Sequence, residues 1–515
     1  MTGAMDPAAV EALQDYIGTA RWFGGKGRGF RVVDVHRAGL LEGLADTTEE
    51  PADGPRVSVE LVTLAYDDGG TDTYQVPLAC YREPQDRLEH AGVGSWEDAD
   101  LGAVHAYDAL HDRFATDLWL RAFAEADPET PHQAGELTFF RLPGHDLDVD
   151  VHSTLFSGEQ SNSSVAFGDD SLMKVFRKVT PGRNPDVVIH RALTEQGSDH
   201  VASLYGWVEL AADTGDGAQE PMQLAMLQQF LRTASDGWDL ALASVRDLFA
   251  EADLHADEVG GDFAGEAERL GLATAQVHDV LAERFPTESW GAEDLEALSQ
   301  AMTARLDAAL AVVPELEVHA DGLRRTFREV TELAGAGQSA TAQRVHGDFH
   351  LGQTLRTVKG WKIVDFEGEP AKPLAERVKP DLVWRDVAGM LRSFDYAAHA
   401  VIDDFHADEQ ANRQIAFRAA EWADRNQSAF LRGYTDNSGR TSGGGLSAHQ
   451  ETVLRAYIAD KAVYEAVYEA RNRPSWLPIP LGAIARLTQA AQETTKSSHA
   501  GTVEVPDTTS EANTA

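Results

Sequence analysis

Hydrophobic positions change their spacing near residue 235, and this change divides the chain into a strand-rich first part and a helical second part. In the first part, short apolar runs bounded by turn residues predict strands. The predicted strands are 57–66, 73–80, 137–142, 165–167, 172–176 and 223–230. The segment DDGG at 67–70 indicates a hairpin between the first two strands. Two helices, 8–18 and 185–196, are also expected here.

The second part repeats apolar residues every three to four positions, as expected of helices that bury one face. The predicted helices are 239–251, 263–284, 291–312, 319–334, 381–400, 408–434, 447–471 and 480–496, interrupted by a loop and short strand at 345–366. These patterns predict an α+β, bilobal fold, in which the cleft between lobes is the favoured ligand site. The expected parts are a β-rich N-terminal cap at 1–134, an intermediate β-rich region at 135–232, a helical lobe at 233–496 and a disordered tail at 497–515.

The overall charge and the cysteine content exclude several classes of partner and site. A formal net charge of −40 would repel nucleic-acid phosphates and anionic lipid headgroups, so neither nucleic acid nor a membrane is an expected partner. No stretch approaches the ~20 apolar residues of a membrane helix. Cys80 is the sole cysteine, which excludes an internal disulfide and suits a reducing compartment. A cytoplasmic protein is expected; the oligomeric state is not determined, and a monomer is compatible with the sequence.

The segment HGDFHLGQ at 346–353 contains residues that phosphoryl transfer requires. That reaction needs a carboxylate that accepts the proton of the acceptor hydroxyl, and oxygen ligands that hold Mg²⁺ on the phosphates of ATP. Asp348 is the candidate catalytic base. Gln353 follows it by five residues, the spacing between the base and the amide metal ligand in kinase catalytic loops.

Two further acids follow the apolar strand of the segment WKIVDFEG at 361–368. Asp365 and Glu367 are candidate ligands of the same Mg²⁺, because this ion prefers oxygen donors. A surface turn with solvated acids is the alternative, but it would not explain an apolar strand that leads into two carboxylates. His346 is expected to shape the loop by hydrogen bonding, and His350 is a candidate substrate contact.

The β-rich region contains the candidate nucleotide site. Lys174 lies inside an apolar strand, where an unpaired lysine is costly, so we expect it to reach the α- and β-phosphates of ATP. The alternative is an edge-strand lysine that points to water. The turn at 157–164, with Ser157, is where a phosphate-binding loop would lie. Gln228 and Phe230 end the last strand before the helices, where the backbone would bind adenine.

The acceptor pocket is expected on the helix 408–434. Four residues of this helix recur every four positions and favour a core stripe over a sugar-binding platform: Trp422, Asn426, Phe430 and Tyr434. The opposite face contains Glu421, Asp424 and Arg425. It is either a solvated face with a Glu421–Arg425 pair or a site whose carboxylates hold a cationic amino sugar.

Several segments together resemble one family, the maltokinase-like branch of the aminoglycoside-phosphotransferase-like kinases, which includes maltokinases and glucosamine kinases. The segments are RWFGGK at 21–26, NPD at 184–186, DFEGEP at 365–370, RDVAGM at 385–390 and YEARNRP at 468–474. The resemblance runs nearly end to end. It implies a fold like that of the eukaryotic protein kinases with an added cap, and transfer of the ATP γ-phosphate to a sugar.

Within this family, the resemblance favours phosphorylation of glucosamine to glucosamine 6-phosphate, with formation of maltose 1-phosphate as the alternative. A nucleotide-binding pseudokinase without turnover is a third reading. The joint presence of Asp348, Gln353 and Asp365 argues against it, since an inactive module need not keep a base and both metal ligands. Asp386 is expected to cap a helix or to anchor the catalytic loop.

One position departs from the family pattern and leaves the partner of Lys174 open. Relatives often carry an acid two residues after the segment NPD, where this chain has Val188. Asp186, His190 or Glu195 could take the place of that acid, or the phosphates alone could orient the lysine.

Overall fold

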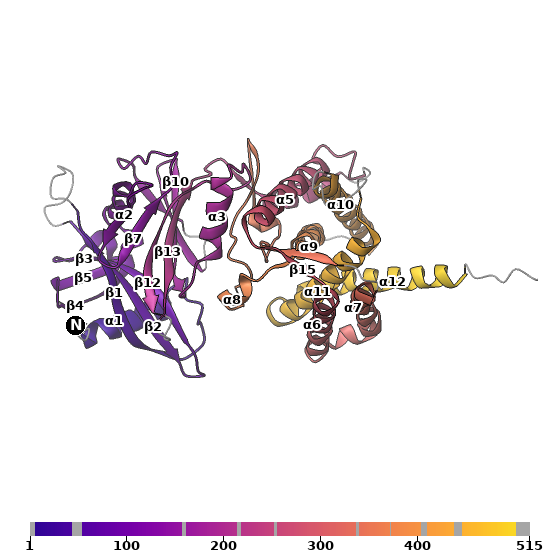
Figure 1. The fold of residues 1–515 in the computed structure, drawn as a ribbon, viewed down its shortest axis with the longest axis horizontal. Coiled ribbons are helices and arrows are strands. Elements are labelled where there is room, and N and C mark those ends of the chain that lie inside the picture. The colour runs from indigo at the N-terminus through magenta and orange to yellow at the C-terminus, as the bar shows by residue number, and fades with distance from the viewer. Residues whose placement is uncertain are drawn as a thin grey trace, which may run out of the picture. The chain divides into compact units, whose positions relative to one another are not determined.

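The computed structural model describes residues 6–43, 54–156, 161–213, 218–251, 255–335, 339–370, 372–402, 409–436 and 445–500. The chain forms two compact units (Figure 1). The first contains residues 1–234 and 357–378, and the second contains residues 235–356 and 379–515. The segment 357–378, which follows the catalytic loop in sequence, therefore belongs to the β-rich first unit.

The first sheet of the first unit is antiparallel, with the strand order β1-β2-β3-β5-β4. Its strands are β1 (Phe30–Leu41), β2 (Arg56–Tyr66), β3 (Thr71–Tyr81), β4 (Gly92–Asp98) and β5 (Gly102–Asp108). The predicted hairpin is confirmed, because β2 and β3 pair up to Ala65 and Thr71 on either side of the turn at 67–70. A short strand from later in the chain, β11 (Lys178–Val179), also pairs with β3 and so adds to this sheet.

The second sheet of the first unit has the order β6-β7-β12-β13-β10-β9-β8. Its strands are β6 (His132–Ala134), β7 (Leu137–Arg141), β8 (Ser153–Leu155), β9 (Asn162–Phe167), β10 (Ser171–Phe176), β12 (Leu204–Asp213) and β13 (Gln219–Gln229). Strand β10 pairs with β9 on one side and β13 on the other. Lys174 is therefore on an interior strand, which rules out the edge-strand alternative.

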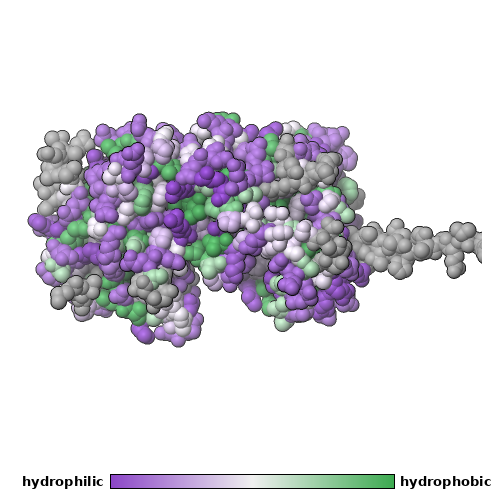
Figure 2. Space-filling model, viewed as in Figure 1, coloured by the Kyte–Doolittle hydropathy of each residue, from purple (hydrophilic) through white to green (hydrophobic). Residues whose placement is uncertain are grey.

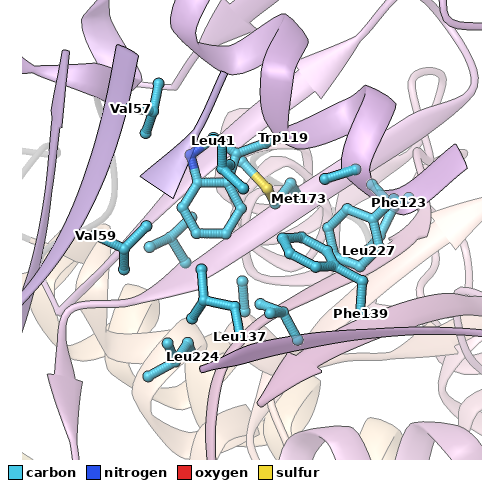
Figure 3. Close-up of a cluster of buried hydrophobic side chains, with 14 of the residues drawn as sticks. Leu41, Val57, Val59, Trp119, Phe123, Leu137, Phe139, Met173, Leu224 and Leu227 are labelled. Carbon is cyan, nitrogen blue, oxygen red and sulfur yellow. The ribbon is translucent and has the colours of Figure 1, made fainter. Parts of the chain in front are cut away.

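One hydrophobic core joins both sheets around the helix α2 (Arg113–Glu125). Figure 3 shows side chains from β2, β7, β10 and β13 packed about Trp119 and Phe123. This helix was not predicted, although Asp112 caps it by accepting a hydrogen bond from the Phe114 amide and Ala115 begins an apolar repeat at every fourth position. The other face of the first sheet is covered by α1 (Pro7–Thr19).

The remaining elements of the first unit are short, apart from α3. They are α3 (Pro185–Glu195), β18 (Gly360–Ile363), α8 (Leu374–Arg377), and the 3₁₀ turns η1 (Asp86–Ala91) and η2 (Ala109–His111). Strands β1, β4, β5 and β12 were not predicted, whereas α1, α3, β2, β3, β7, β9, β10 and β13 lie within a few residues of their predicted bounds.

The second unit is helical, as the 3.6-residue periodicity predicted. Its long helices are α4 (Gly237–Ala250), α5 (Ala264–Arg284), α6 (Ala292–Leu310), α7 (Ala320–Gly335), α9 (Trp384–Ala400), α10 (Glu409–Asp436), α11 (Ala448–Asn472) and α12 (Pro478–Ala500). Its short elements are β14 (Ser235–Asp236), β15 (Glu288–Trp290), β16 (Ala340–Gln343), β17 (Thr354–Thr357), β19 (Asp381–Leu382), η3 (Pro314–His319), η4 (Leu351–Gln353) and η6 (Pro474–Trp476). Helices α5 and α10 touch backbone to backbone, since a Cβ added to Gly433 would lie 1.9 Å from the Glu268 carbonyl oxygen.

The last element of the described chain is the helix α12 (Pro478–Ala500). Helix α12 continues to Ala500, and residues 501–515 of the predicted tail lie outside the described residues. The visible face of the molecule is mostly hydrophilic (Figure 2). Across the described ranges, every helix falls short of the length and apolarity that crossing a bilayer requires.

Candidate active site

Lys174 lies at the centre of a cluster of carboxylates in the first unit. Its Nζ is 2.9 Å from Asp186 Oδ2, 2.8 Å from Asp365 Oδ1 and 2.9 Å from Glu367 Oε1. Burial opposes the charge of the lysine, but the three carboxylates outweigh it and raise the pKa of Lys174 well above its ordinary value. The lysine is therefore a fixed cation held by three acids from two segments of the chain, α3 and the end of β18.

Asp186 is the partner that the sequence left open for Lys174. It lies in the first turn of α3, which Asn184 caps by accepting a hydrogen bond from the Asp186 amide. The same carboxylate accepts a 2.9 Å hydrogen bond from the Phe366 amide through Oδ1, and His190 Nδ1 lies 3.0 Å from that oxygen. Burial opposes ionisation, but Lys174 and His190 hold the pKa of Asp186 far below its usual range. Asp186 thus joins the lysine to the strand end that carries the candidate metal ligands.

Asp365 follows β18 in an unusual backbone conformation. Its φ of +65° lies in the left-handed region, which aspartate tolerates better than most residues with a Cβ. Strain of this kind is concentrated at functional sites. The conformation turns the carboxylate toward Lys174, and the Phe366 amide that follows is held by Asp186.

Glu367 is fixed by both Lys174 and Asn162, whose Nδ2 donates a 2.8 Å hydrogen bond to Glu367 Oε1. Burial raises the pKa of Glu367, and the neighbouring carboxylates add to this effect. Ligand oxygens of Asp186, Asp365 and Glu367 all lie within 4.8 Å of one another. Three carboxylate groups at this spacing fit a hard divalent cation such as Mg²⁺. The sequence assigned this role to Asp365 and Glu367, and the structure adds Asp186 to the group.

Of the predicted nucleotide contacts, the structure describes Gln228 and Phe230 but not Ser157. Ser157 lies outside the described residues. Gln228 pairs with Leu172 on one side and Leu204 on the other, inside the second sheet. The Phe230 amide donates to the Asp170 carbonyl oxygen at 2.7 Å, so a nucleotide base at this strand end would use carbonyl oxygens or a later amide.

An aromatic pair that the sequence reasoning missed lies at the same strand end. The ring centroids of Phe156 and Phe230 are 5.7 Å apart, and Phe156 is 42% exposed. Phe156 directly precedes the predicted phosphate-binding turn, so an aromatic residue at that position was an available signal. An exposed ring there can pack against a planar base.

Asp386 organises the catalytic loop in the second unit. Its buried carboxylate accepts hydrogen bonds from the amides of His346 at 2.7 Å and Gly347 at 2.8 Å, and lies 3.0 Å from His278 Nε2. Helix α9 carries Asp386 and packs directly under the loop, because a Cβ added to its Gly389 would lie 2.5 Å from the Phe349 carbonyl oxygen. The interpretation of Asp386 as an anchor of the loop is confirmed.

Asp348 is partly buried at the tip of this loop. Burial opposes ionisation, but the positive charge of Lys461, with smaller contributions from His350 and His346, lowers the pKa of Asp348 below its ordinary value. Lys461 Nζ lies 3.4 Å from Asp348 Oδ1. The Asp348 amide points at His346 Nδ1 at 3.4 Å, in keeping with the loop-shaping role expected of that histidine. A carboxylate that is ionised and partly accessible can accept a proton.

His350 directly precedes the short turn η4, and Gln353 is its last residue. The ring of His350 caps this turn by accepting a hydrogen bond from the Gly352 amide at 3.1 Å. The backbone N–H of Gln353 donates a hydrogen bond to the His350 carbonyl oxygen at 2.9 Å. These hydrogen bonds fix the backbone conformation of residues 350–353, between the candidate base and Gln353. The substrate role of His350 and the metal role of Gln353 stay predictions.

Helix α10 buries the face that its four-residue repeat predicted to be a core stripe. Its four repeated residues are all buried: Trp422, Asn426, Phe430 and Tyr434. The Glu421–Arg425 pair of the solvated-face reading is not observed, since Glu421 Oε1 lies 2.8 Å from His255 Nδ1 and Arg425 forms two bonds to Asp262, at 2.6 and 3.1 Å. Asp424 is exposed. A contact of these residues with substrate stays a prediction.

Lys461 and Glu465 lie one turn apart on α11, and each also has a partner on another element. Glu465 Oε2 accepts two hydrogen bonds from Arg392, at 2.7 and 2.9 Å. Lys461 contacts the candidate base, which is 113 positions away in the chain. Sequence spacing within one helix could not reveal this contact.

Comparison with known proteins identifies the family to which the chain belongs. The family model "Maltokinase N-terminal cap domain" matches residues 16–112, and the model "Phosphotransferase enzyme family" matches residues 252–423. A glucosamine kinase from Streptacidiphilus jiangxiensis is 31% identical over 330 residues, which are 62% of this chain and 70% of that protein. A glucosamine kinase from Mycolicibacterium smegmatis is 28% identical over 344 residues, covering 65% and 79% of the two chains.

The fold also resembles that of a solved structure, a glucosamine kinase in complex with glucosamine, ADP and inorganic phosphate. The two agree with a TM-score of 0.62 over 92% of this chain and 98% of the other, at 23% identity. The predicted aminoglycoside-phosphotransferase-like fold with a β-rich cap is therefore confirmed. Together with the two family models and the relative at 31% identity, this shows that the chain belongs to the maltokinase-like branch of the phosphotransferase enzyme family and is a kinase related to the glucosamine kinases.

Proposed function

We propose that this kinase transfers the γ-phosphate of ATP to the 6-hydroxyl of glucosamine, giving glucosamine 6-phosphate and ADP. The observation that carries the proposal is the 31% identity to a glucosamine kinase over 70% of that protein's length. The carboxylate base in the second unit and the lysine–carboxylate cluster in the first supply the groups that phosphoryl transfer needs.

The proposed roles follow from the chemistry of each group. Asp348 accepts the proton of the acceptor hydroxyl as that oxygen bonds to the γ-phosphorus and the bond to ADP breaks. Lys174 binds the α- and β-phosphates. Asp365, Glu367 and Gln353 hold Mg²⁺, which when bound neutralises charge on the phosphates.

Maltose is the alternative acceptor, and the match to a maltokinase cap favours it. The test is ADP release by the purified full chain with glucosamine, glucose and maltose at equal concentrations, with the product located by phosphorus NMR. A phosphomonoester at C6 of glucosamine is the expected product. Faster turnover of maltose, with phosphate at C1, would replace the glucosamine proposal by the maltose one. Absence of ADP release with every sugar would favour the pseudokinase reading.

Replacing Asp365 with alanine is expected to remove the Mg²⁺ dependence of ATP binding. The change deletes a charged oxygen ligand and one of three acids around Lys174, so Mg²⁺ would no longer tighten ATP binding. Calorimetric titration of ATP with and without Mg²⁺ measures the effect. As a control, Asp199→Ala removes an acid of the same unit that lies outside the cluster. An unchanged MgATP affinity in the Asp365 variant would place the metal elsewhere.

Replacing Asp424 with asparagine tests the recognition of the amino group. If Asp424 binds the ammonium group, the loss of a charge-assisted hydrogen bond, ~1.5–3 kcal/mol, raises KM for glucosamine about tenfold or more. KM for glucose, which has no ammonium group, should change little. Glu421→Gln tests the second candidate acid, which lies one turn away and is paired with His255. Equal losses on both sugars would mean that Asp424 is structural.

A further inference from the structure

Lys461 on α11 is the cation that lies against the candidate base. Its Nζ is 3.4 Å from Asp348 Oδ1 and 5.3 Å from the centre of the Tyr464 ring on the same helix. The side chains of Lys461 and Asp348 are 34% and 28% exposed, so the pair is partly shielded from water. A contact of this kind is stronger than a fully exposed ion pair and leaves room for a ligand beside it.

Two carboxylates near Lys461 on the protein side are paired with arginines. Arg392 binds both Glu465 and Asp395, and Arg486 Nη2 lies 3.1 Å from Asp395 Oδ1. Lys461 adds to the positive charge near Glu465, whose pKa burial nevertheless raises. The ion pair between Lys461 and Asp348 places the same ammonium group against the candidate base.

The contact also leaves part of the carboxylate accessible. Lys461 approaches Oδ1, while Asp386 holds the catalytic loop through the amides of His346 and Gly347. A carboxylate fixed through one oxygen presents the other in a defined direction. General bases require such positioning within hydrogen-bond reach of the proton they remove.

We propose that Lys461 is a positioning residue of the catalytic base, holding Asp348 through Oδ1 so that Oδ2 accepts the proton of the acceptor hydroxyl. This inference rests on the proposed function, because it takes Asp348 as the base. Lys461 also keeps that base ionised at acidic pH. The other titratable groups around the loop are His346, His350 and Asp386, and the Lys461 variants leave all three residues unsubstituted.

The test is the pH profile of kcat and of kcat/KM for three variants of the full chain. Lys461→Met removes the charge and keeps the length of the side chain, and Lys461→Arg keeps the charge. Arg455→Met is the matched control, because it removes a cation of the same helix that is paired with Glu329. Melting temperature and calorimetric MgATP affinity are measured for each.

Lys461→Met is expected to lower kcat at pH 6 by about tenfold or more, the size of a lost charge-assisted contact. Lys461 lowers the pKa of Asp348, so removing the lysine should raise that pKa. The acid limb of the pH profile then moves to higher pH. The difference in kcat between Lys461→Met and wild type should therefore become smaller above pH 8. Lys461→Arg should keep the wild-type profile and most of the rate. Arg455→Met should match wild type throughout.

Two outcomes separate this inference from the proposed function. If Asp348→Asn is inactive but Lys461→Met keeps the wild-type profile and rate, the positioning role is wrong and the base assignment stands. If Asp348→Asn retains activity, the base assignment itself is wrong. A rate loss in Lys461→Met that is equal at all pH values and is not rescued by arginine would mean that Lys461 acts in another way, which also overturns the inference.

Discussion

Replacing Asp348 with asparagine is expected to lower kcat at least ~100-fold, the contribution typical of a general base. The amide has nearly the same shape as the carboxylate but cannot take up the proton of the acceptor hydroxyl. Affinity for MgATP should change by no more than about twofold, because the base acts on the acceptor and not on the nucleotide. Steady-state ADP release and calorimetric titration with MgATP measure the two quantities.

The control for this variant is Asp460→Asn, which makes the same change at an acid on α11 that is paired with Arg305. It should retain wild-type turnover. Retention of more than about a tenth of wild-type kcat in Asp348→Asn would reject Asp348 as the base, given the size of the expected effect. A fall in MgATP affinity equal to the fall in kcat would instead assign Asp348 to nucleotide binding.

Replacing Asp386 with alanine is expected to produce the largest loss of stability among these variants. The change leaves the buried amides of His346 and Gly347, and the ring of His278, without their acceptor. Each unsatisfied buried donor costs about 1–3 kcal/mol, so the free energy of unfolding should fall by at least ~3 kcal/mol. Chemical denaturation followed by tryptophan fluorescence measures this, and kcat should fall as well because the loop loses its anchor.

The pH dependence of this loss follows from the pKa of Asp386, which His278 and His346 hold below its ordinary value against the effect of burial. An acid whose pKa is lowered by folding stabilises the protein above the pKa of the unfolded chain, about 3.9. The difference between wild type and variant should therefore be full at pH 7 and shrink as the pH falls below about 4. Asp321→Ala, at an exposed acid, should cost less than ~0.5 kcal/mol. An equally small effect at Asp386 would contradict its anchoring role.

Local sequence determined most of the secondary structure in the helical unit. Helices such as α5 and α11 lie within two residues of their predicted bounds, since a 3.6-residue apolar repeat depends only on neighbours in the chain. The helix α2 was missed despite its cap and its apolar residues at every fourth position, because the neighbouring segments of the β-rich cap were expected to be strands. Strands are harder to predict, since their pairing partners lie far away in the sequence.

The sequence by itself also indicated the candidate residues for the chemistry: a base and an amide five positions apart, two acids after an apolar strand, and a lysine inside another strand. These signals are local, because catalytic loops fix their spacing along the chain. Which groups meet was decided only by the tertiary structure. Asp365 lies 191 positions from Lys174, and Lys461 lies 113 positions from Asp348. Such contacts depend on how strands and helices pack against one another. Neither the periodicity of apolar residues nor the spacing of motifs along the chain indicates this packing.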